Sequence, residues 1–131
     1  MQSICIEGTA ASPTINFNSN GSLLIQGRSL PEDVNKLYNP LIEFVGTLDV
    51  PSVLFNVNLD YFNTATSKKL MDLFRTLDAN NNVGQVKINW YFEEGDDDSV
   101  EMAEIYEDMM LKTTFVYHEY AEEQEPELEE A

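Results

Sequence analysis

The chain has 131 residues and a formal net charge of −17, with seven basic residues against twenty-four acidic ones. Apolar residues make up 43% of it, which is enough for one packed core, so the acidity belongs to a folded protein and does not indicate wholesale disorder. A chain this acidic repels phosphate backbones and anionic lipid headgroups. Its composition therefore argues against binding to nucleic acid or to a membrane surface.

Nearly all of the negative charge lies in the last third of the sequence. Residues 1–92 carry eight acids against six bases, whereas residues 93–131 carry sixteen acids against Lys112 alone. The glutamate-rich segment after His118 has too few apolar residues to repay the entropy cost of ordering. We therefore expect one domain over residues 1–118 and an acidic, disordered C-terminal tail over residues 119–131.

The first half of the chain predicts strands followed by a helix. Residues 3–6 are a short strand candidate, and residues 14–17 and 23–27 predict an antiparallel hairpin around the turn at 18–21. Residues 29–33 then have the features of a helix start, with Pro31 suited to the first turn. Apolar residues spaced by three and four continue to residue 48, and Pro40 either kinks this helix or divides it.

The second half alternates strands and helices. Strands are predicted at 53–59, 86–92 and 114–118, with a helix after Asn63 and another after an acidic loop at 93–98. The buried face of that last helix is expected to contain Val100, Ala103, Ile105, Tyr106, Met109 and Met110. This alternation predicts a single α/β domain, with a mixed β-sheet, helices packed against it and the order β-β-α-β-α-β-α-β.

The single cysteine bears on the compartment. Cys5 alone excludes an internal disulfide and a zinc site built from several thiolates, and it is expected to be a small buried apolar residue. The N-terminus has no basic region followed by an apolar run, and no apolar stretch approaches the ~20 residues that span a bilayer. We therefore expect a cytoplasmic protein.

No pattern in the sequence predicts a metal site, a cofactor site or an active site. Asp78, Asn80 and Asn82 have the spacing of a calcium loop, but the positions that require glycine and glutamate hold Val83 and Asn89. The run 96–98 is more typical of a solvated acidic loop than of a cation site. The only histidine, at 118, has no identifiable nucleophile beside it, and there is no glycine-rich phosphate loop.

The junction between the strand at 53–59 and the following helix is the most informative place. Helix N-termini at the carboxyl ends of strands offer unpaired N–H groups and a partial positive charge. Thr64 lies at this junction, and a phosphoryl group on it would have Lys68 one turn away. Asn63 is a strong N-cap residue, but Thr64 itself could be the cap. One alternative is therefore a constitutive interaction or scaffold domain in which Thr64 is only a helix cap.

The chain resembles the bacterial SiaC family of regulatory phosphoproteins over about residues 4–118. The block Tyr61-Phe62-Asn63-Thr64 and the strand Val86-Lys87-Ile88-Asn89-Trp90-Tyr91-Phe92 are the most specific parts of the resemblance. The remaining blocks follow the family's order: Glu7-Gly8-Thr9, Thr14-Ile15-Asn16-Phe17, Gly21-Ser22-Leu23-Leu24-Ile25-Gln26-Gly27-Arg28-Ser29, Pro31-Glu32, and Leu59-Asp60 before the specific block.

The resemblance implies a fold similar to STAS and anti-sigma-factor antagonist proteins, with no catalysis of its own. It also implies phosphorylation of Thr64 by a partner Ser/Thr kinase and dephosphorylation by a PP2C-type phosphatase. The unmodified form would bind and activate a diguanylate cyclase, in c-di-GMP signalling. Ala65 stands where the family usually has serine, which removes one alternative acceptor. Thr66 and Ser67 remain as less favoured acceptor sites. The residues expected to surround the switch and to contact partners are Asp60, Tyr61, Phe62, Asn63 and Lys68.

Overall fold

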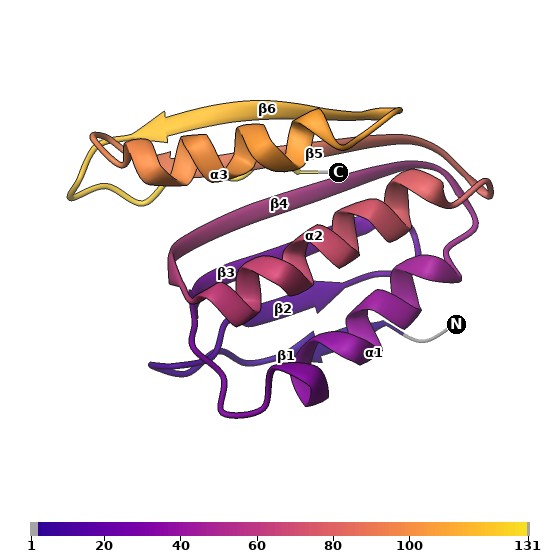
Figure 1. Ribbon diagram of the computed structural model, residues 1–131, viewed down its shortest axis with the longest axis horizontal. Coiled ribbons are helices and arrows are strands. Elements are labelled where there is room, and N and C mark those ends of the chain that lie inside the picture. The colour runs from indigo at the N-terminus through magenta and orange to yellow at the C-terminus, as the bar shows by residue number, and fades with distance from the viewer. Residues whose placement is uncertain (1–2, 131) are drawn as a thin grey trace.

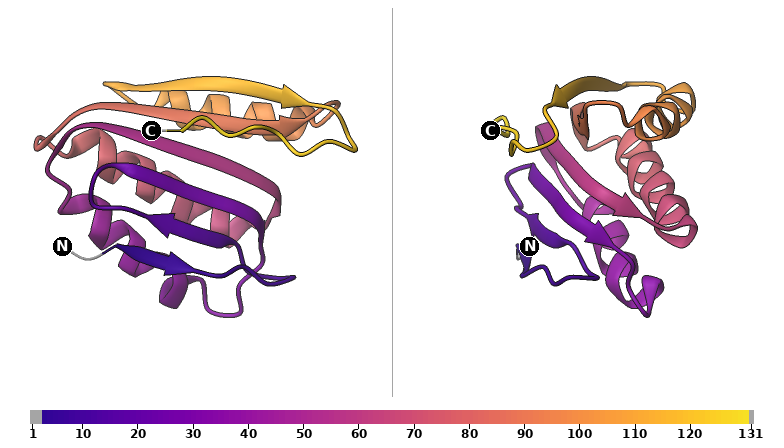
Figure 2. Two further views of the ribbon diagram at one scale, coloured as in Figure 1. Left: turned by 180° about the vertical axis from the view of Figure 1, so that it is seen from behind. Right: turned by 90° about the vertical axis from the view of Figure 1, so that its left-hand side faces the viewer.

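The computed structural model describes residues 3–130; residues 1, 2 and 131, at the outer ends of the expected domain and tail, lie outside the described residues. The described chain forms one six-stranded sheet with three helices on one of its faces (Figures 1 and 2). The strands are β1 (Ile4–Ile6), β2 (Thr14–Phe17), β3 (Ser22–Ser29), β4 (Val50–Phe62), β5 (Val83–Glu93) and β6 (Thr113–Tyr120). The helices are α1 (Val34–Gly46), α2 (Thr64–Ala79) and α3 (Asp97–Asp108).

The strands lie in the sheet in their order along the chain. Strand β2 is antiparallel to its neighbours β1 and β3, and β3, β4, β5 and β6 are parallel, with one helix in each crossover of the parallel part. The prediction of a single α/β domain with a mixed sheet is therefore confirmed. The strand candidate at 3–6 is β1 at the edge, so three strands precede α1.

The core lies between the helices and the face of the sheet that they cover. Phe74 of α2 is at its centre, with ring centroids 5.7 Å from Phe55, 5.6 Å from Phe115 and 5.3 Å from Tyr106. These are edge-to-face contacts, the geometry that aromatic quadrupoles favour. Because the three partners come from β4, β6 and α3, one side chain of α2 connects three other elements.

Helix α1 begins later than the sequence suggested. Asp33 is its N-cap and accepts a hydrogen bond from the Lys36 backbone N–H (3.1 Å), so Pro31 precedes the helix and does not lie in its first turn. The expected start was wrong because Ser29 is the last residue of β3, where its side chain is fully buried. Pro40 lies inside one continuous helix.

Two other boundaries differ from the expected ones. Strand β4 runs to Phe62, so only Asn63 separates it from α2. The acidic loop ends earlier than expected: Asp96 is the N-cap of α3 and accepts from the Ser99 N–H (3.2 Å), while Asp97 lies in the first helical turn. Carboxylates in a first turn favour a helix because its N-terminus is partially positive.

The expected buried face of α3 was too wide. Only Ala103 and Tyr106 are buried in this helix, whereas Ile105 and Met109 are each 54% exposed. Helix α3 contacts β5 and β6 at the edge of the sheet, and its neighbours cover one side of it only (Figure 1). Apolar spacing alone did not show that the opposite side has no element packed on it.

The face of the sheet opposite the helices is crossed by the end of the chain. Strand β6 ends at Tyr120, two residues beyond the expected domain boundary. A turn closed by the hydrogen bond from Gln124 N to Ala121 O (2.9 Å) then reverses the chain. Residues 121–130, which are neither helix nor strand, return over this open face (Figure 2).

One carboxylate fixes the turn between α3 and β6. Asp78 of α2 accepts hydrogen bonds from the backbone N–H groups of Leu111 (2.9 Å), Lys112 (2.9 Å) and Thr113 (3.0 Å), and from the Thr113 hydroxyl (2.8 Å). Partial burial acts to raise the pKa of the Asp78 carboxyl, but these hydrogen bonds outweigh it and the pKa is lowered. Asp78 therefore belongs to the structural framework.

We predict that Asp78→Ala lowers the free energy of unfolding by about 2 kcal/mol at pH 7, because four donors lose a charged acceptor that water replaces only in part. The matched control is Asp72→Ala on the exposed side of the same helix. Because the folded-state pKa of Asp78 is lowered, its charge stabilises the fold above the unfolded-state value, and this part is lost as pH falls through the folded-state value. Urea titrations at pH 7 and pH 3 measure the difference; equal losses for the two variants at pH 7 would contradict the prediction.

Candidate functional site

The site predicted from the sequence lies at the end of the sheet where the parallel strands finish, which we call the Thr64 edge. Strands β4 and β5 finish there, and the N-termini of α2 and α3 begin there (Figure 1). Thr64 is the first residue of α2 and is exposed to solvent. Helix N-termini at such an edge present backbone N–H groups and a partial positive charge to a ligand or a modification.

Asn63, and not Thr64, is the N-cap of α2. The Asn63 side-chain oxygen accepts from the Thr66 backbone N–H (2.9 Å), and the Asn63 backbone N–H donates to the carbonyl of Ser29 (3.3 Å). The alternative interpretation of Thr64 as the helix cap is therefore wrong. The Thr64 hydroxyl makes no hydrogen bond to another residue in the described part of the chain.

The next hydroxyl along the chain, that of Thr66, is completely buried. It lies 2.9 Å from the Ser29 hydroxyl and donates to the Ser29 carbonyl (3.0 Å). The Ser29 hydroxyl is in turn 2.7 Å from the Tyr38 hydroxyl of α1. Burial raises the pKa of Tyr38 to about 12. We call these three residues the Ser29–Tyr38–Thr66 cluster.

The third hydroxyl, that of Ser67, is half-buried and already bonded. It lies 2.8 Å from the Tyr106 hydroxyl, which donates to the Ser67 carbonyl (3.1 Å), and 3.5 Å from the Met102 sulfur. Burial raises the pKa of Tyr106 to about 12. Of the three possible acceptors, Thr64 therefore has the accessible hydroxyl, and the other two have structural partners within the fold.

Aromatic residues lie directly before Thr64. Tyr61 is 54% exposed, and the Arg28 guanidinium lies 5.8 Å from the centre of its ring, within cation–π range. Phe62 is half-buried against Trp90, with the two ring centroids 6.2 Å apart. Lys68, one turn along α2 from Thr64, is exposed. The edge therefore offers an apolar surface beside the accessible hydroxyl.

A small hollow of about 240 Å³ adjoins this surface and combines apolar with acidic side chains. Its lining residues are Leu59, Asp60, Tyr61, Phe62, Asp96, Asp98, Ser99 and Met102. A hydrogen bond of 3.5 Å connects the Tyr120 hydroxyl to Asp60. Burial first, and then the charges of Asp60 and Glu93, raise the pKa of Tyr120 to about 12. A negative charge added at this hollow would therefore be repelled by the carboxylates that line it.

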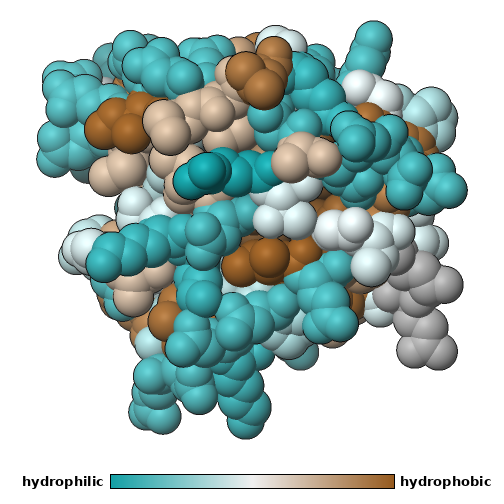
Figure 3. Space-filling view, turned by 45° about the vertical axis from the view of Figure 1, so that its right-hand side comes forward, coloured by the Kyte–Doolittle hydropathy of each residue, from teal (hydrophilic) through white to brown (hydrophobic). Residues whose placement is uncertain are grey.

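Further apolar surface lies on and after α3. Ile105 and Met109 are half-exposed and Leu111 is 98% exposed. Brown apolar patches interrupt the hydrophilic surface in the upper part of Figure 3, at the height of α3 and β6 in Figure 1. None of the described helices has both the length and the apolar character needed to cross a membrane.

His118, the only histidine, has structural partners on the sheet. Nε2 of His118 lies 2.9 Å from the Asn89 side-chain oxygen, and its ring stacks on Tyr91. Cys5 is an exposed free thiol on β1, so its expected burial was wrong. Within residues 3–130 there is no group of three or more His, Cys, Asp or Glu side chains that could hold a metal ion.

The model of the family described as "SiaC family regulatory phosphoprotein" matches residues 6–120. The chain belongs to the SiaC family. The match includes the whole edge around Thr64 and ends where β6 ends, so residues 121–131 of this SiaC family member lie outside it.

Solved structures show the same fold. SiaC of Pseudomonas aeruginosa, in its apo crystal structure, has a TM-score of 0.74 and 25% identity, covering 90% of this chain and 99% of that one. A second structure of that protein has a TM-score of 0.73 and 25% identity over 90% and 100% of the two chains. A chain in the complex of the diguanylate cyclase SiaD with its activator SiaC, from the same organism, has a TM-score of 0.77 and 23% identity over 89% and 99%. No curated protein was found to match.

Sequence reasoning missed the residues that hold the site in place. The Ser29–Tyr38–Thr66 cluster joins three elements that are far apart in the sequence, and Tyr106 holds Ser67 from α3. The sequence did contain a signal for the cluster, because Ser29 follows an alternating strand pattern. We interpreted Ser29 instead as part of a helix start. The contacts with Tyr38 and Tyr106 had no local signal.

We predict that Asn63→Ala lowers the free energy of unfolding by about 1 kcal/mol, because the Thr66 N–H loses the cap that Asn63 supplies. Thr64→Ala should change it by a few tenths at most, since Thr64 is the first helical residue and alanine favours a helix. Urea denaturation of the two variants in parallel measures the difference. A larger loss for Thr64→Ala than for Asn63→Ala would contradict this assignment of the cap.

Proposed function

We propose that this protein is a non-enzymatic regulator whose affinity for an effector is switched by phosphorylation of Thr64. A Ser/Thr kinase would add the phosphate and a PP2C-type phosphatase would remove it. The effector would be a diguanylate cyclase, as SiaD is for SiaC in the complex from Pseudomonas aeruginosa. The protein would act in the cytoplasm, where a kinase has its ATP. Membership of a family of regulatory phosphoproteins supports the proposal at the level of class.

The observation that carries the proposal is the accessible Thr64 hydroxyl at the start of α2. A kinase must bring the acceptor oxygen into its own active site, which an exposed side chain at a helix start permits without unfolding. Thr66 would first have to leave the Ser29–Tyr38–Thr66 cluster, and Ser67 would have to leave Tyr106. These costs favour Thr64 over the two alternatives.

The electrostatics of the edge explain how a phosphate there could act as a switch. It adds close to two negative charges at pH 7, and the helix N-terminus with exposed Lys68 can partly neutralise them within the fold. An effector docked on Tyr61 and Phe62 would still have to desolvate the phosphate beside Asp60. Coupling of this kind typically changes affinity by about 5–150-fold. The expected direction is weaker binding.

We predict that protein isolated from its own cells carries a single phosphate, and that Thr64→Ala abolishes it. The matched control is Thr76→Ala in the same helix, which removes a hydroxyl bonded to the Asp72 carbonyl and should leave phosphorylation unchanged. Intact-mass measurement counts the phosphates, and fragmentation maps their position. Phosphate found on Thr66 or Ser67 alone would overturn the assignment.

We also predict that Thr64→Glu weakens binding to a diguanylate cyclase of the same organism by about 5–150-fold, while Thr64→Gln, which has similar size and no charge, weakens it much less. Titration calorimetry gives the affinities, and melting curves check that both variants keep the stability of the parent. Identical affinities for the two variants would favour a constitutive interaction domain over a switch.

A further inference from the structure

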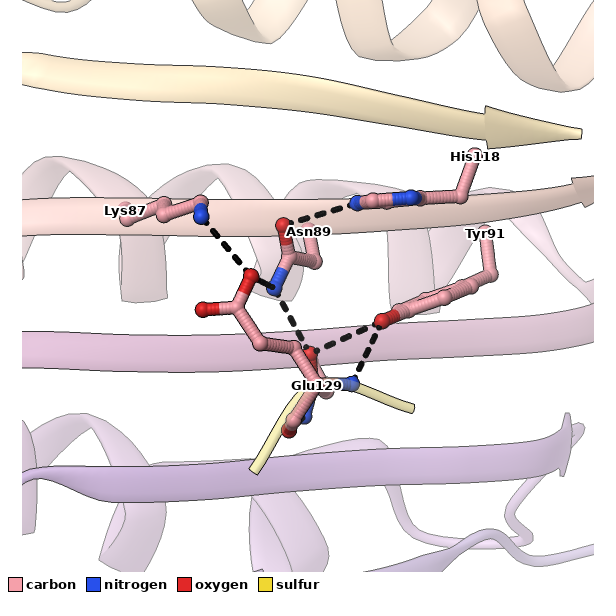
Figure 4. A network of polar contacts seen from close by, with 6 residues as sticks. Lys87, Asn89, Tyr91, His118 and Glu129 are labelled. Carbon is pink, nitrogen blue, oxygen red and sulfur yellow. Dashed lines mark hydrogen bonds and ion pairs between the residues drawn. The ribbon is translucent and has the colours of Figure 1, made fainter. Parts of the chain in front are cut away.

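The open face of the sheet carries a polar cluster that the proposed function does not use. Asn56 of β4 and Asn89 of β5 are paired in register and buried, although no helix covers this face. The Asn89 side-chain N–H donates to the Asn56 side-chain oxygen (3.0 Å), and the Tyr91 hydroxyl lies 3.4 Å from the same oxygen. His118 stacks on Tyr91 with ring centroids 4.6 Å apart. The cluster is therefore held in place from within the sheet (Figure 4).

The returning C-terminal segment binds this cluster through the backbone of Glu129. The Asn56 side-chain N–H donates to the Glu129 carbonyl (2.8 Å), and the Glu129 backbone N–H donates to the Tyr91 hydroxyl (2.9 Å). Both main-chain groups of one residue are thus paired with side chains of the sheet, much as a neighbouring strand would pair them. A ligand consisting of a carboxylate alone would not make this pair of contacts.

The side chain of Glu129 is bound separately. Its Oε1 lies 2.7 Å from Lys87 Nζ and 3.3 Å from Asn89 Nδ2 (Figure 4). The hydrogen bond from Lys87 first, together with that from Asn89, lowers the pKa of the Glu129 carboxyl. This ion pair is partly exposed, so it contributes little affinity alone, but it distinguishes glutamate from a neutral residue.

General attraction between charges does not explain this docking. Residues 121–130 contain six glutamates and no base, and the molecule that they fold onto is itself strongly acidic. Directional hydrogen bonds must therefore favour the docked position. One of them also satisfies Asn56, and within the described residues no buried side-chain nitrogen or oxygen lacks a partner. Burying such an amide without an acceptor would be unfavourable.

The covalent link between β6 and Glu129 raises the local concentration of the C-terminal segment at this face of the sheet. Residues 121–128 connect the end of β6 to Glu129, and linkers of this length give effective concentrations on the order of mM. The four residues that contact Glu129 lie within the part of the chain that matches the family, whereas Glu129 lies outside it. The residues that bind Glu129 and the segment that contains Glu129 therefore lie in separate parts of the sequence.

We propose that the open face of the sheet is a peptide-binding site that recognises a glutamate through its backbone and its carboxylate. Its occupant is the C-terminal segment 121–130 of the same chain. The site is distinct from the Thr64 edge, because the residues that bind Glu129 lie on the open face of β4 and β5.

Amide hydrogen exchange in the full chain, measured by NMR, tests the site. We expect the Glu129 amide to exchange more slowly than its neighbours, and Tyr91→Phe, which removes its acceptor, to abolish this protection. Glu129→Gln should reduce the protection about twofold to fivefold, because it removes only an exposed ion pair. Glu127→Gln, which removes the same charge two residues away, should leave it unchanged. An unprotected Glu129 amide in the parent chain, or equal effects of the two glutamine variants, would overturn the proposal.

A synthetic peptide of residues 121–131 provides an independent test that does not rely on the Tyr91 variant folding. It is added to full-length Glu129→Ala protein, whose own tail lacks the carboxylate contacts, in excess of that tail's effective concentration, which is on the order of mM. We expect the side-chain amide signals of Asn56 and Asn89 to move toward their positions in the parent protein. A peptide with glutamine at position 129 should need a severalfold higher concentration. Signals that do not move with either peptide, or that move equally with both, would contradict recognition of the glutamate.

Discussion

The arrangement of the Thr64 edge depends on the buried Ser29–Tyr38–Thr66 cluster. Three hydroxyl groups from β3, α1 and α2 share short hydrogen bonds where water is excluded, and the Ser29 carbonyl also accepts from the Asn63 N–H. Leaving any of these groups unpaired would be costly, which fixes the direction in which α2 leaves the sheet. With Thr66 held inward and Asn63 committed to the cap, Thr64 is left facing solvent.

The sequence predicted the parts of the fold that depend on local periodicity. Alternation in β4 and β5 and the three- and four-residue spacing in α2 were sufficient for the mixed sheet and its crossovers. Prediction failed where one residue has two plausible local roles. Ser29 resembles a helix cap but ends a strand, and Ile105 fits a buried stripe but lies over the edge of the sheet, where no neighbour covers it. These outcomes depend on contacts that are distant in the sequence.

The candidate site was predictable in place but not in detail. The block around Thr64 identified the edge, because residues at the carboxyl end of a strand and the start of a helix are adjacent in the sequence. The choice among three neighbouring hydroxyls required tertiary contacts, since Thr66 is held by Ser29 of β3 and Ser67 by Tyr106 of α3. The polar cluster on the open face was missed because asparagines in a strand give no indication of what covers them.

The first-turn position of Thr64 also has a kinetic consequence. A residue that begins a helix and whose hydroxyl makes no hydrogen bond within the described chain could be modified and restored while the native state persists. If Thr64 carries the proposed phosphate, the time needed to remove it would be set by the turnover of the modifying enzymes and not by local unfolding, which for buried hydroxyls would add a slow step. The rigid scaffold thus permits a rapidly reversible mark.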